Sequence, residues 1–334
     1  MKTAVVILNW NTEGFLKEFL PGLLHSVGKV DGAEVIVADN ASTDGSLKVM
    51  QELFPQVRTI AFEKNYGFTG GYNKAFDQID SEYLVLINSD IEVTENWLGP
   101  LMDWMDTHPE CGACAPKLHS WQERDKFEYA GAAGGYIDRF GYPFCRGRVL
   151  KRLETDNGQY DRPKDVFWAT GACLMVRSSL YRQLGGLDDR FFAHMEEIDL
   201  CWRMQLEGWK VTVVPDSVVY HVGGGTLPAE SPFKVLLNFR NNLLMLDNNL
   251  AKTFALKLYK EGNDIGTSAA RGRRQATARI AARKCLDAIS AIVYLFTFRL
   301  SYFKAVIKAY SEYKDYSRSY PGETVLTEYL KEYG

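Results

Sequence analysis

Continuous apolar runs alternate with segments of helical spacing over the first ninety residues of the chain. The apolar runs are rich in valine and isoleucine and lie at residues 4–8, 35–38, 57–62 and 83–87. The segments with helical spacing lie between them, at residues 12–28, 44–53 and 70–79. Unbroken apolar runs of this length are typical of strands that are buried on both faces. The alternation therefore predicts an α/β fold, in which helices flank a mostly parallel central sheet.

The pattern changes after this region. Residues 112–176 contain many glycines and aromatic residues, which predicts loops and short antiparallel strands. A helix is expected over residues 195–207, with Gly208 as its stop. Two strands are expected next, at residues 210–214 and 218–221. From there the spacing is helical to the end, so the chain divides into an α/β domain at residues 1–230 and a C-terminal helical region at residues 231–334.

Composition narrows the class of protein. Hydrophobic residues make up 46% of the 334 residues and charged residues 24%, which is typical of a globular chain. The formal net charge of −3 gives no support to a nucleic-acid partner. Cys111 and Cys114 form a C-x-x-C without a second close pair, so we expect reduced, apolar cysteines rather than a zinc site.

The sequence also bears on the protein's location. The N-terminal apolar run is too short for the core of a signal peptide, and no uncharged apolar stretch of about 18 residues occurs. We therefore expect a cytoplasmic protein. Residues 251–318 hold 14 lysine and arginine residues against 5 acidic ones. The helical region is thus expected either to pack on the α/β domain or on a second subunit, or to lie at the inner face of a membrane with anionic lipid.

Polar residues follow three of the predicted strands directly. They are Asn9 and Asn11 after the first strand, Asp39 after the second, and Asn88, Ser89 and Asp90 after the strand at 83–87. In a parallel sheet, ligands bind beyond the carboxyl ends of the strands. A carboxylate placed there, such as Asp39, can accept hydrogen bonds from a nucleotide base or a ribose. For Ser42, Thr43 and Asp44 we expect capping of the next helix.

A glycine-rich run over residues 65–74 precedes a predicted helix. It contains Asn65, Gly70 and Asn73. Glycines allow backbone amides to approach a ligand closely, and a helix N-terminus favours the charge of a diphosphate. The alternative is a tight turn between a strand and a helix.

A metal ion has two candidate ligands. Asp90 ends a buried strand and can supply an anionic oxygen to Mg²⁺ or Mn²⁺, with phosphate oxygens completing the shell. Asn88 is neutral and more plausibly bonds a ribose hydroxyl. His221 ends a predicted strand before three glycines, which favours a ligand role over the structural role usual for a lone histidine.

Three acidic residues crowd the first turn of the helix expected at 195–207. The helix dipole stabilises their ionised forms, which suits a general base. Asp199 and Arg203 have the i,i+4 spacing of an ion pair, so Asp199 is expected to be structural. This leaves Glu196 or Glu197 to take a proton from a hydroxyl group. The alternative is a solvated, acidic helix start.

Together these segments resemble glycosyltransferase family 2, in particular its bacterial rhamnosyltransferase-like members. The matching segments are VVILNWN at 5–11, VADNASTDGS at 37–46, NYGFTGGYNKA at 65–75, VLINSDIEV at 85–93, WATGACLMVRSS at 168–179, GGLDDRFFAHMEEIDLCWR at 185–203 and YHVGGGT at 220–226. RNN at 240–242 matches a further helical signature. Seven segments in the right order make the resemblance specific.

The resemblance implies a GT-A fold whose N-terminal half binds a nucleotide sugar. It implies that Asp39 contacts the base, that Asp90 binds the metal as the last acid of a D-x-D motif, and that Glu197 is the catalytic base. Two positions depart from the family pattern: Asn88 replaces the first acid of D-x-D, and Glu197 replaces an aspartate. The resemblance also implies that the acceptor is flanked by Trp168, Thr170 and Gly171. A core role for Trp168 is the alternative.

The function implied is inverting transfer of a sugar, with dTDP-rhamnose the first candidate donor and a UDP- or GDP-sugar the next. The acceptor would be a hydroxyl on a glycan or a lipid-linked glycan. The alternatives are a noncatalytic nucleotide-sugar-binding protein and a sugar-nucleotide pyrophosphorylase. The latter should carry a basic, glycine-rich N-terminal loop, where this chain has Leu8-Asn9-Trp10-Asn11.

Overall fold

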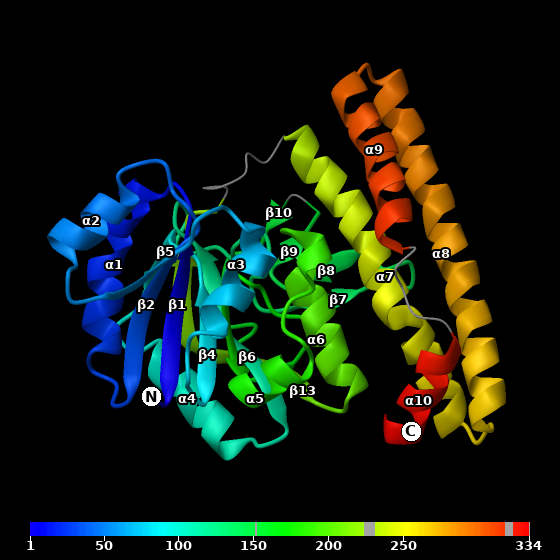
Figure 1. Cartoon of the computed structure of the whole chain (residues 1–334), viewed down its shortest axis with the longest axis horizontal. Helices are drawn as coiled ribbons and strands as arrows, with labels where there is room; N and C mark the ends of the chain where they lie inside the picture. Colours follow the sequence, from blue (N-terminus) through cyan, green and yellow to red (C-terminus); the bar gives the residue numbers. More distant parts are fainter. Residues whose placement is uncertain (151, 224–230, 318–322, 334) are drawn as a thin grey trace.

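One large sheet forms the centre of the α/β part of the molecule (Figure 1). The computed structural model describes residues 1–150, 152–223, 231–317 and 323–333. Within these residues, nine strands form the sheet, in the order β11-β13-β6-β12-β4-β1-β2-β3 with β5 paired to β13. They are β1 (Thr3–Asn9), β2 (Ala33–Asp39), β3 (Arg58–Ala61), β4 (Tyr83–Ile87), β5 (Ile91–Val93), β6 (Cys111–Ser120), β11 (Lys164–Asp165), β12 (Cys173–Arg177) and β13 (Lys210–His221).

The sheet is mostly parallel, which confirms the predicted fold class. β1 pairs in parallel with β2 and β4, β2 with β3, and β6 with β13. β12 lies antiparallel between β4 and β6. Consequently β1, β2, β4 and β13 all end at the same edge of the sheet, and the polar residues that follow them gather there.

Helices cover both faces of the sheet because successive residues of a strand point to opposite sides. Val5 and Ile7 of β1 pack in one apolar core with α1 (Glu13–Val27) and α4 (Leu98–Thr107). Ala4 and Val6 pack in a second core with α3 (Gly67–Phe76). The predicted helices at 12–28, 44–53 and 70–79 correspond to α1, α2 (Ser46–Leu53) and α3.

Two predictions for the middle of the chain were wrong in part. Residues 112–176 do contain two small antiparallel sheets, but β6 is a fully buried strand of the central sheet, parallel to β13. The strands expected at 210–214 and 218–221 are one strand, β13, whose register shifts between Val214 and Val218. A bulge there accommodates Pro215, which has no N–H to donate to the ladder.

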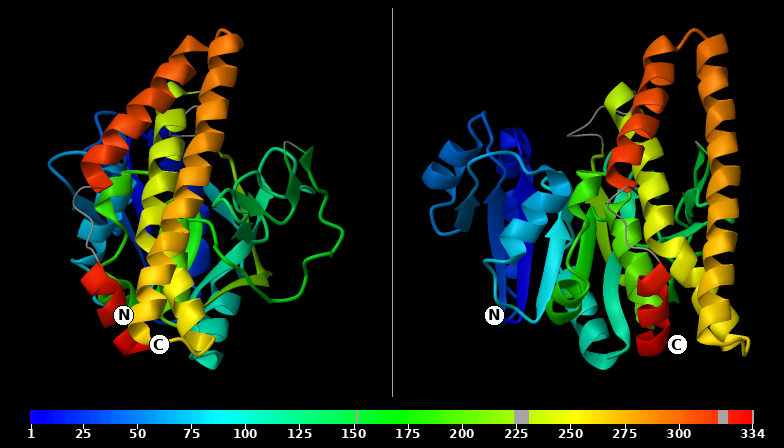
Figure 2. Two further views of the ribbon diagram at one scale, coloured as in Figure 1. Left: turned by 90° about the vertical axis from the view of Figure 1, so that its right-hand side faces the viewer. Right: turned by 45° about the vertical axis from the view of Figure 1, so that its right-hand side comes forward.

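The described residues of the C-terminal region form four helices, as expected. They are α7 (Pro232–Lys260), α8 (Ile265–Phe296), α9 (Leu300–Ser317) and α10 (Glu323–Tyr333). Figures 1 and 2 show them along one side of the sheet domain, with α8 and α9 forming a long hairpin. Leu243 and Leu244 of α7 share an apolar core with α3 and α6 (Glu196–Leu206). Among the described residues, no helix combines the length and the apolar character that crossing a membrane requires.

Candidate active site

The turn after β4 meets the end of β13 at the carboxyl edge of the sheet. Asn88, Ser89 and Asp90 form this turn, and Asp90 is buried. Nε2 of His221, the last residue of β13, lies 3.2 Å from Oδ1 of Asp90 and 3.5 Å from Nδ2 of Asn88. The two predicted metal ligands are therefore adjacent. The glycines at 224 and 225 that follow His221 lie outside the described residues.

The arrangement of Asp90 and His221 fits a divalent cation. Burial lowers the pKa of His221, but hydrogen bonds and charges from Asp90 and Glu128 outweigh it and raise the pKa to about 10. The ring thus holds a positive charge between two carboxylates, where a cation could replace the proton. Adjacent ligands of an octahedral ion bound at about 2.1 Å lie about 3 Å apart, close to the 3.2 Å between Nε2 and Oδ1.

Further ligands would have to come from elsewhere. No group of three or more histidine, cysteine or acidic side chains suited to a metal occurs among the described residues. Phosphate oxygens and water commonly complete the shell of Mg²⁺. The pair of ligands is thus suited to a metal that arrives with a phosphorylated molecule.

Glu128 is a member of the site that the sequence did not indicate. Its Oε1 lies 3.4 Å from Nδ1 of His221, on the far side of the ring from Asp90. A carboxylate in this position orients a metal-binding histidine and raises its basicity. Glu128 lies in the segment for which only loops and short strands were predicted. It does not follow a predicted strand of the central sheet, so its place in the site could not be predicted.

Two carboxyl groups are buried in the first turn of α6. Glu196 is only 5% exposed, and Glu197 is partly buried. In the described part of the chain, Oε2 of each side chain lacks a hydrogen-bond partner. The alternative of a solvated acidic helix start is therefore wrong.

Burial sets the protonation of these groups. Burial and the charge of Glu197 raise the pKa of Glu196 well above its ordinary value. Burial raises the pKa of Glu197 to about 7. Burial lowers the pKa of the neighbouring His194 to about 4, so its ring is neutral. A carboxyl group with a pKa near 7 is suited to accept a proton at neutral pH.

The turn that leads into α6 is strained. Phe192, His194 and Met195 have φ angles of 65°, 70° and 73°. Non-glycine residues in this region cost about 1–3 kcal/mol each and gather at functional sites. The turn therefore needs support from elsewhere in the molecule.

Asn241 of α7 supplies that support. Its Nδ2 donates to the carbonyl oxygens of Phe191, Ala193 and His194 at 2.9, 2.7 and 2.8 Å. Nη2 of Arg240 also donates to the Phe191 carbonyl, at 2.9 Å. The RNN signature thus holds the start of α6, a role that its sequence position alone did not reveal.

Gly171 connects the metal side of the site to Glu197. A Cβ on Gly171 would lie 3.4 Å from Cβ of Glu197. The next residue, Ala172, accepts a hydrogen bond of 2.9 Å from the backbone N–H of Asn88. The turn that carries Asp90 and the first turn of α6 therefore both lie next to the short segment Gly171–Ala172.

Trp168 and Thr170 have structural roles. Trp168 is 5% exposed, packs against Gly135, and donates its indole N–H to the Tyr136 carbonyl at 3.0 Å. Thr170 is buried, and its hydroxyl accepts from the N–H of Ala172 at 3.2 Å. This corrects the prediction that both contact an acceptor, because neither presents a free surface.

The residues after β1 and β2 bond to one another. Nδ2 of Asn9 donates to Asp39 at 2.8 Å and to Ser42 at 3.0 Å. The Asp39 carboxylate also accepts from the N–H of Ser42 at 2.9 Å. Oδ1 of Asn11 accepts from the N–H of Thr43 at 2.7 Å, so it ties the two loops together.

Helix capping by this segment differs in part from the prediction. Ser42 and Thr43 do not cap α2. Asp44 accepts from the N–H of Ser46 at 3.0 Å, at the start of α2, and from the N–H of Glu13 at 3.0 Å, at the start of α1. One carboxylate thus caps two helices.

The glycine-rich run does not form the expected diphosphate cradle. Its glycines, including Gly70, lie inside the first turns of α3 rather than before it. The Phe192 carbonyl accepts from the N–H groups of Phe68 and Thr69, and Asn65 accepts from that of Gly67. The N–H groups of Gly67, Phe68 and Thr69 at this helix end are therefore already bonded, the first of them to the side chain of Asn65.

The prediction that Asn73 binds a nucleotide sugar is also corrected. Its Nδ2 donates to the Leu187 carbonyl at 2.8 Å and to Asp189 at 2.7 Å. Its Oδ1 accepts from the Tyr181 hydroxyl at 2.6 Å and from the N–H of Leu187 at 3.0 Å. Every donor and acceptor of this amide is used to join α3 to the segment before α6.

The first half of this site lies within a known sequence family. The sequence model described as "Glycosyl transferase family 2" matches residues 4–185, which is more than half of the chain. The chain belongs to glycosyl transferase family 2. The matched range includes Asp39, Asp90 and Gly171 and ends before α6.

Two relatives of this family 2 glycosyltransferase are named as sugar transferases. It is 28% identical over 240 residues to the N-acetylglucosaminyl-diphospho-decaprenol L-rhamnosyltransferase of Mycobacterium tuberculosis, covering 65% of this chain and 75% of the relative. It is 23% identical over 265 residues to the low-salt glycan biosynthesis hexosyltransferase Agl10 of Haloferax volcanii, covering 75% and 77%.

Solved structures of other glycosyltransferases share the GT-A fold. The mannosyltransferase PcManGT from Pyrobaculum calidifontis, solved with GDP-Man and Mn²⁺, has a TM-score of 0.52 at 15% identity, covering 93% of this chain and 86% of that one. S. aureus TarS 1–349 in complex with UDP-GlcNAc has a TM-score of 0.52 at 15% identity, covering 94% and 92%.

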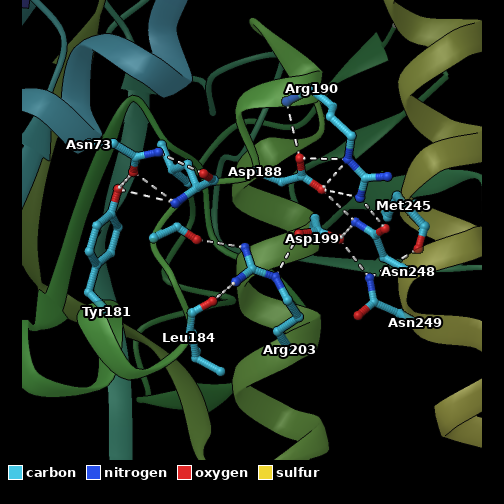
Figure 3. A network of polar contacts seen from close by, with 12 residues as sticks. Asn73, Tyr181, Leu184, Asp188, Arg190, Asp199, Arg203, Met245, Asn248 and Asn249 are labelled. Carbon is cyan, nitrogen blue, oxygen red and sulfur yellow. Dashed lines mark hydrogen bonds and ion pairs between the residues drawn. The ribbon is translucent and has the colours of Figure 1, made fainter. Parts of the chain in front are cut away.

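A second polar network in the transferase joins α6 to α7 (Figure 3). Asp199 is fully buried and pairs with Nε of Arg203 at 2.7 Å, as predicted. Nδ2 of Asn248 and of Asn249 in α7 also donate to Asp199, at 2.9 and 2.8 Å. Asp199 is therefore structural, and α7 determines the position of the helix that carries Glu197.

Proposed function

We propose that this family 2 glycosyltransferase is an inverting enzyme that transfers a hexose from a nucleoside-diphosphate sugar to a glycan hydroxyl. The convergence of Asp90, His221 and Glu197 around Gly171 carries the proposal. A metal-ligand pair and a carboxyl group with a raised pKa are what such a transfer requires. Family membership favours this reading over a sugar-nucleotide pyrophosphorylase.

The donor and acceptor are inferred from the relatives. L-rhamnose is the first candidate sugar, and a lipid-linked glycan the first candidate acceptor, because the M. tuberculosis relative is named for both. The solved neighbours hold UDP- and GDP-linked sugars, which are the next candidates. We assign the nucleoside to the loops after β1 and β2, near Asn9, Asn11 and Asp39. Ser89 and Asn88 face the same edge and would contact the ribose or phosphates.

A divalent cation would be held by Asp90 and His221, with Glu128 orienting the imidazole ring. When bound, Mg²⁺ or Mn²⁺ would neutralise charge on the diphosphate of the donor. Mn²⁺ accompanies the donor in the structure of the mannosyltransferase. Loss of the Asp90 carboxylate should therefore weaken donor binding more with metal present than without it.

We assign the general base to Glu197 rather than Glu196. Glu197 is the less buried of the two and lies beside Gly171, whereas burial and the charge of Glu197 raise the pKa of Glu196 well above its ordinary value. The ionised Glu197 takes the proton of the acceptor hydroxyl while the hydroxyl oxygen forms its bond to the anomeric carbon. The bond from that carbon to the phosphate oxygen breaks, and its electron pair leaves with the nucleoside diphosphate. One displacement of this kind inverts the anomeric configuration.

A pair of variants tests the assignment. Glu197→Gln should lower kcat by about 10²–10⁴-fold while a nucleotide sugar with Mn²⁺ still raises the melting temperature of the protein. Glu196→Gln replaces the carboxyl group beside Glu197 by a neutral amide of similar shape. This variant should lower kcat far less. If the wild-type protein binds a donor but transfers no sugar to any glycan acceptor, the alternative of a noncatalytic nucleotide-sugar-binding protein is favoured. If no dTDP-, UDP- or GDP-sugar binds, the proposal fails.

A further inference from the structure

The α8–α9 hairpin ends in a cluster of exposed apolar side chains. Phe296, at the end of α8, is 76% exposed, and Phe298, in the turn before α9, is 89% exposed. We call the surface that they form with their exposed apolar neighbours the hairpin tip; these neighbours are Ile289, Ile292, Val293, Leu295, Leu300 and Ile307. Several large apolar side chains exposed near one end of a protein are typical of an interaction site.

Packing against the described residues of the chain leaves the side chains of the hairpin tip exposed. Ile289, Ile292, Val293 and Phe296 are spaced by three or four residues, so they form a stripe on one face of α8. The helix buries a different face, through Ala291. On α9, Ala305 and Ala309 pack against Leu236 and Leu237 of α7, whereas Ile307 points to solvent.

The charges at the hairpin tip are all positive. Residues 288–311 contain Arg299, Lys304 and Lys308 and no acidic residue. All three basic residues are exposed, and Lys308 lies 3.7 Å from Glu312 at the edge of the segment. Apolar side chains flanked by lysine and arginine match the interface of a bilayer that contains anionic lipid. Two copies joined through this surface would bring like charges together.

The hairpin tip points in the same direction as the candidate active site. In Figure 1 the N-terminus marks the start of β1, so the carboxyl ends of β1, β2 and β4 lie toward the upper end of the molecule. The hairpin extends beyond the sheet domain at that same end in both figures. A bilayer in contact with the tip would therefore lie on the side to which the active site belongs.

We infer that the hairpin tip docks the protein on the surface of an anionic bilayer, with Phe296 and Phe298 entering the interface and Arg299, Lys304 and Lys308 facing lipid headgroups. This surface is separate from the residues that perform the transfer, so the inference does not rest on the proposed function. It does provide a route by which a lipid-borne acceptor could reach the site.

Co-sedimentation with vesicles tests the inference. The full-length protein should bind vesicles of phosphatidylcholine with 30% phosphatidylglycerol, bind less to phosphatidylcholine alone, and dissociate as salt is raised. The double variant Phe296→Asp/Phe298→Asp should lose at least about tenfold in vesicle affinity, because two aromatic side chains no longer enter the interface. Leu53→Asp, at an exposed leucine of α2, is the matched control and should bind as the wild type does.

Each result has a distinct meaning. A melting-temperature shift with a nucleotide sugar, measured on the same variants, shows whether they are folded and separates loss of docking from loss of the active site. Wild-type protein that binds neither vesicle overturns the inference. So does a dimer, seen by light scattering, that Phe296→Asp/Phe298→Asp abolishes without vesicle binding by the wild type, since the surface would then belong to a second copy of the chain.

Discussion

At the scale of single residues, burial creates the chemistry of this site. Glu196 and Glu197 occupy one helix turn in an environment that disfavours two negative charges. Burial therefore affects the two groups differently: it raises the pKa of Glu196 well above its ordinary value and that of Glu197 to about 7. This is the arrangement expected where one carboxyl group must accept a proton and its neighbour must not compete.

The activity should follow the ionisation of Glu197. Because only the carboxylate can take the acceptor proton, kcat/KM should rise with pH through about 7 and then level off. A profile of kcat/KM between pH 5.5 and 8.5 at saturating Mn²⁺ measures this. A profile that is flat over this range would show that another group is the base.

Glu196 should reduce stability at alkaline pH. Its pKa is higher in the folded protein than in the unfolded chain, so its contribution to stability is present at low pH and is lost as the pH rises above about 4.5. Glu196→Gln removes this effect and should raise the melting temperature by about 2–4 °C at pH 8, with no difference at pH 4. Glu18→Gln, on the exposed face of α1, should change neither value. An unchanged melting temperature for Glu196→Gln at pH 8 would mean that the Glu196 carboxylate is stabilised in the fold.

At the scale of secondary-structure elements, the start of α6 depends on α7. The three left-handed residues before α6 have no glycine among them, and Asn241 holds the turn through three carbonyl groups. A hydrogen-bond donor is required at this position because carbonyl oxygens only accept. The position of Glu197 is thus determined by a helix that the family match at residues 4–185 does not reach.

Variants of Asn241 test this dependence. Asn241→Ala should reduce the free energy of unfolding by about 1–3 kcal/mol, because three carbonyl groups lose their donor, and kcat should fall with it. Asn241→Asp should be worse, since a carboxylate would repel the same carbonyl oxygens. Asn238→Ala, one turn earlier on α7, is the control and should have little effect. Chemical denaturation measures the free energy of unfolding, and initial rates measure kcat. Equal effects of Asn241→Ala and Asn241→Asp would argue against a role for the Asn241 amide in holding this turn.

The sequence predicted those elements whose own residues form a regular apolar pattern. β1, β2 and β4 were identified because each is an unbroken apolar run, and α1 and α6 because their apolar spacing is regular. β6 was missed because Gly112, Pro116 and Lys117 interrupt its apolar character. At the candidate site, Asp90, His221 and Glu197 were predicted from their positions at the ends of elements, and the structure places Asp90 beside His221. The roles of Asn73, Glu128 and Asn241 could not be predicted from the sequence, because each role depends on partners that are far away in the chain.

At the scale of the whole molecule, the two predicted regions act as one unit. The strands β1, β2, β4 and β13 bring their polar ends to one edge, and α7 packs against α6 from the other side. Arg240, Asn241, Asn248 and Asn249 of the helical region all bond to residues around α6. The boundary expected at residue 230 falls in a segment outside the described residues, and α7 beyond it bonds to residues at the start of α6 and within it.

The stereochemistry of transfer tests the central claim most directly. The product can be followed by proton NMR during reaction of a nucleoside-diphosphate sugar, L-rhamnose first, with a polyprenyl-diphosphate-linked N-acetylglucosamine. A single displacement with Glu197 as base predicts that the first product has the anomeric configuration opposite to that of the donor, and that Glu197→Gln forms it far more slowly. A product that retains the donor's configuration, or a Glu197→Gln protein as fast as the wild type, would contradict the account.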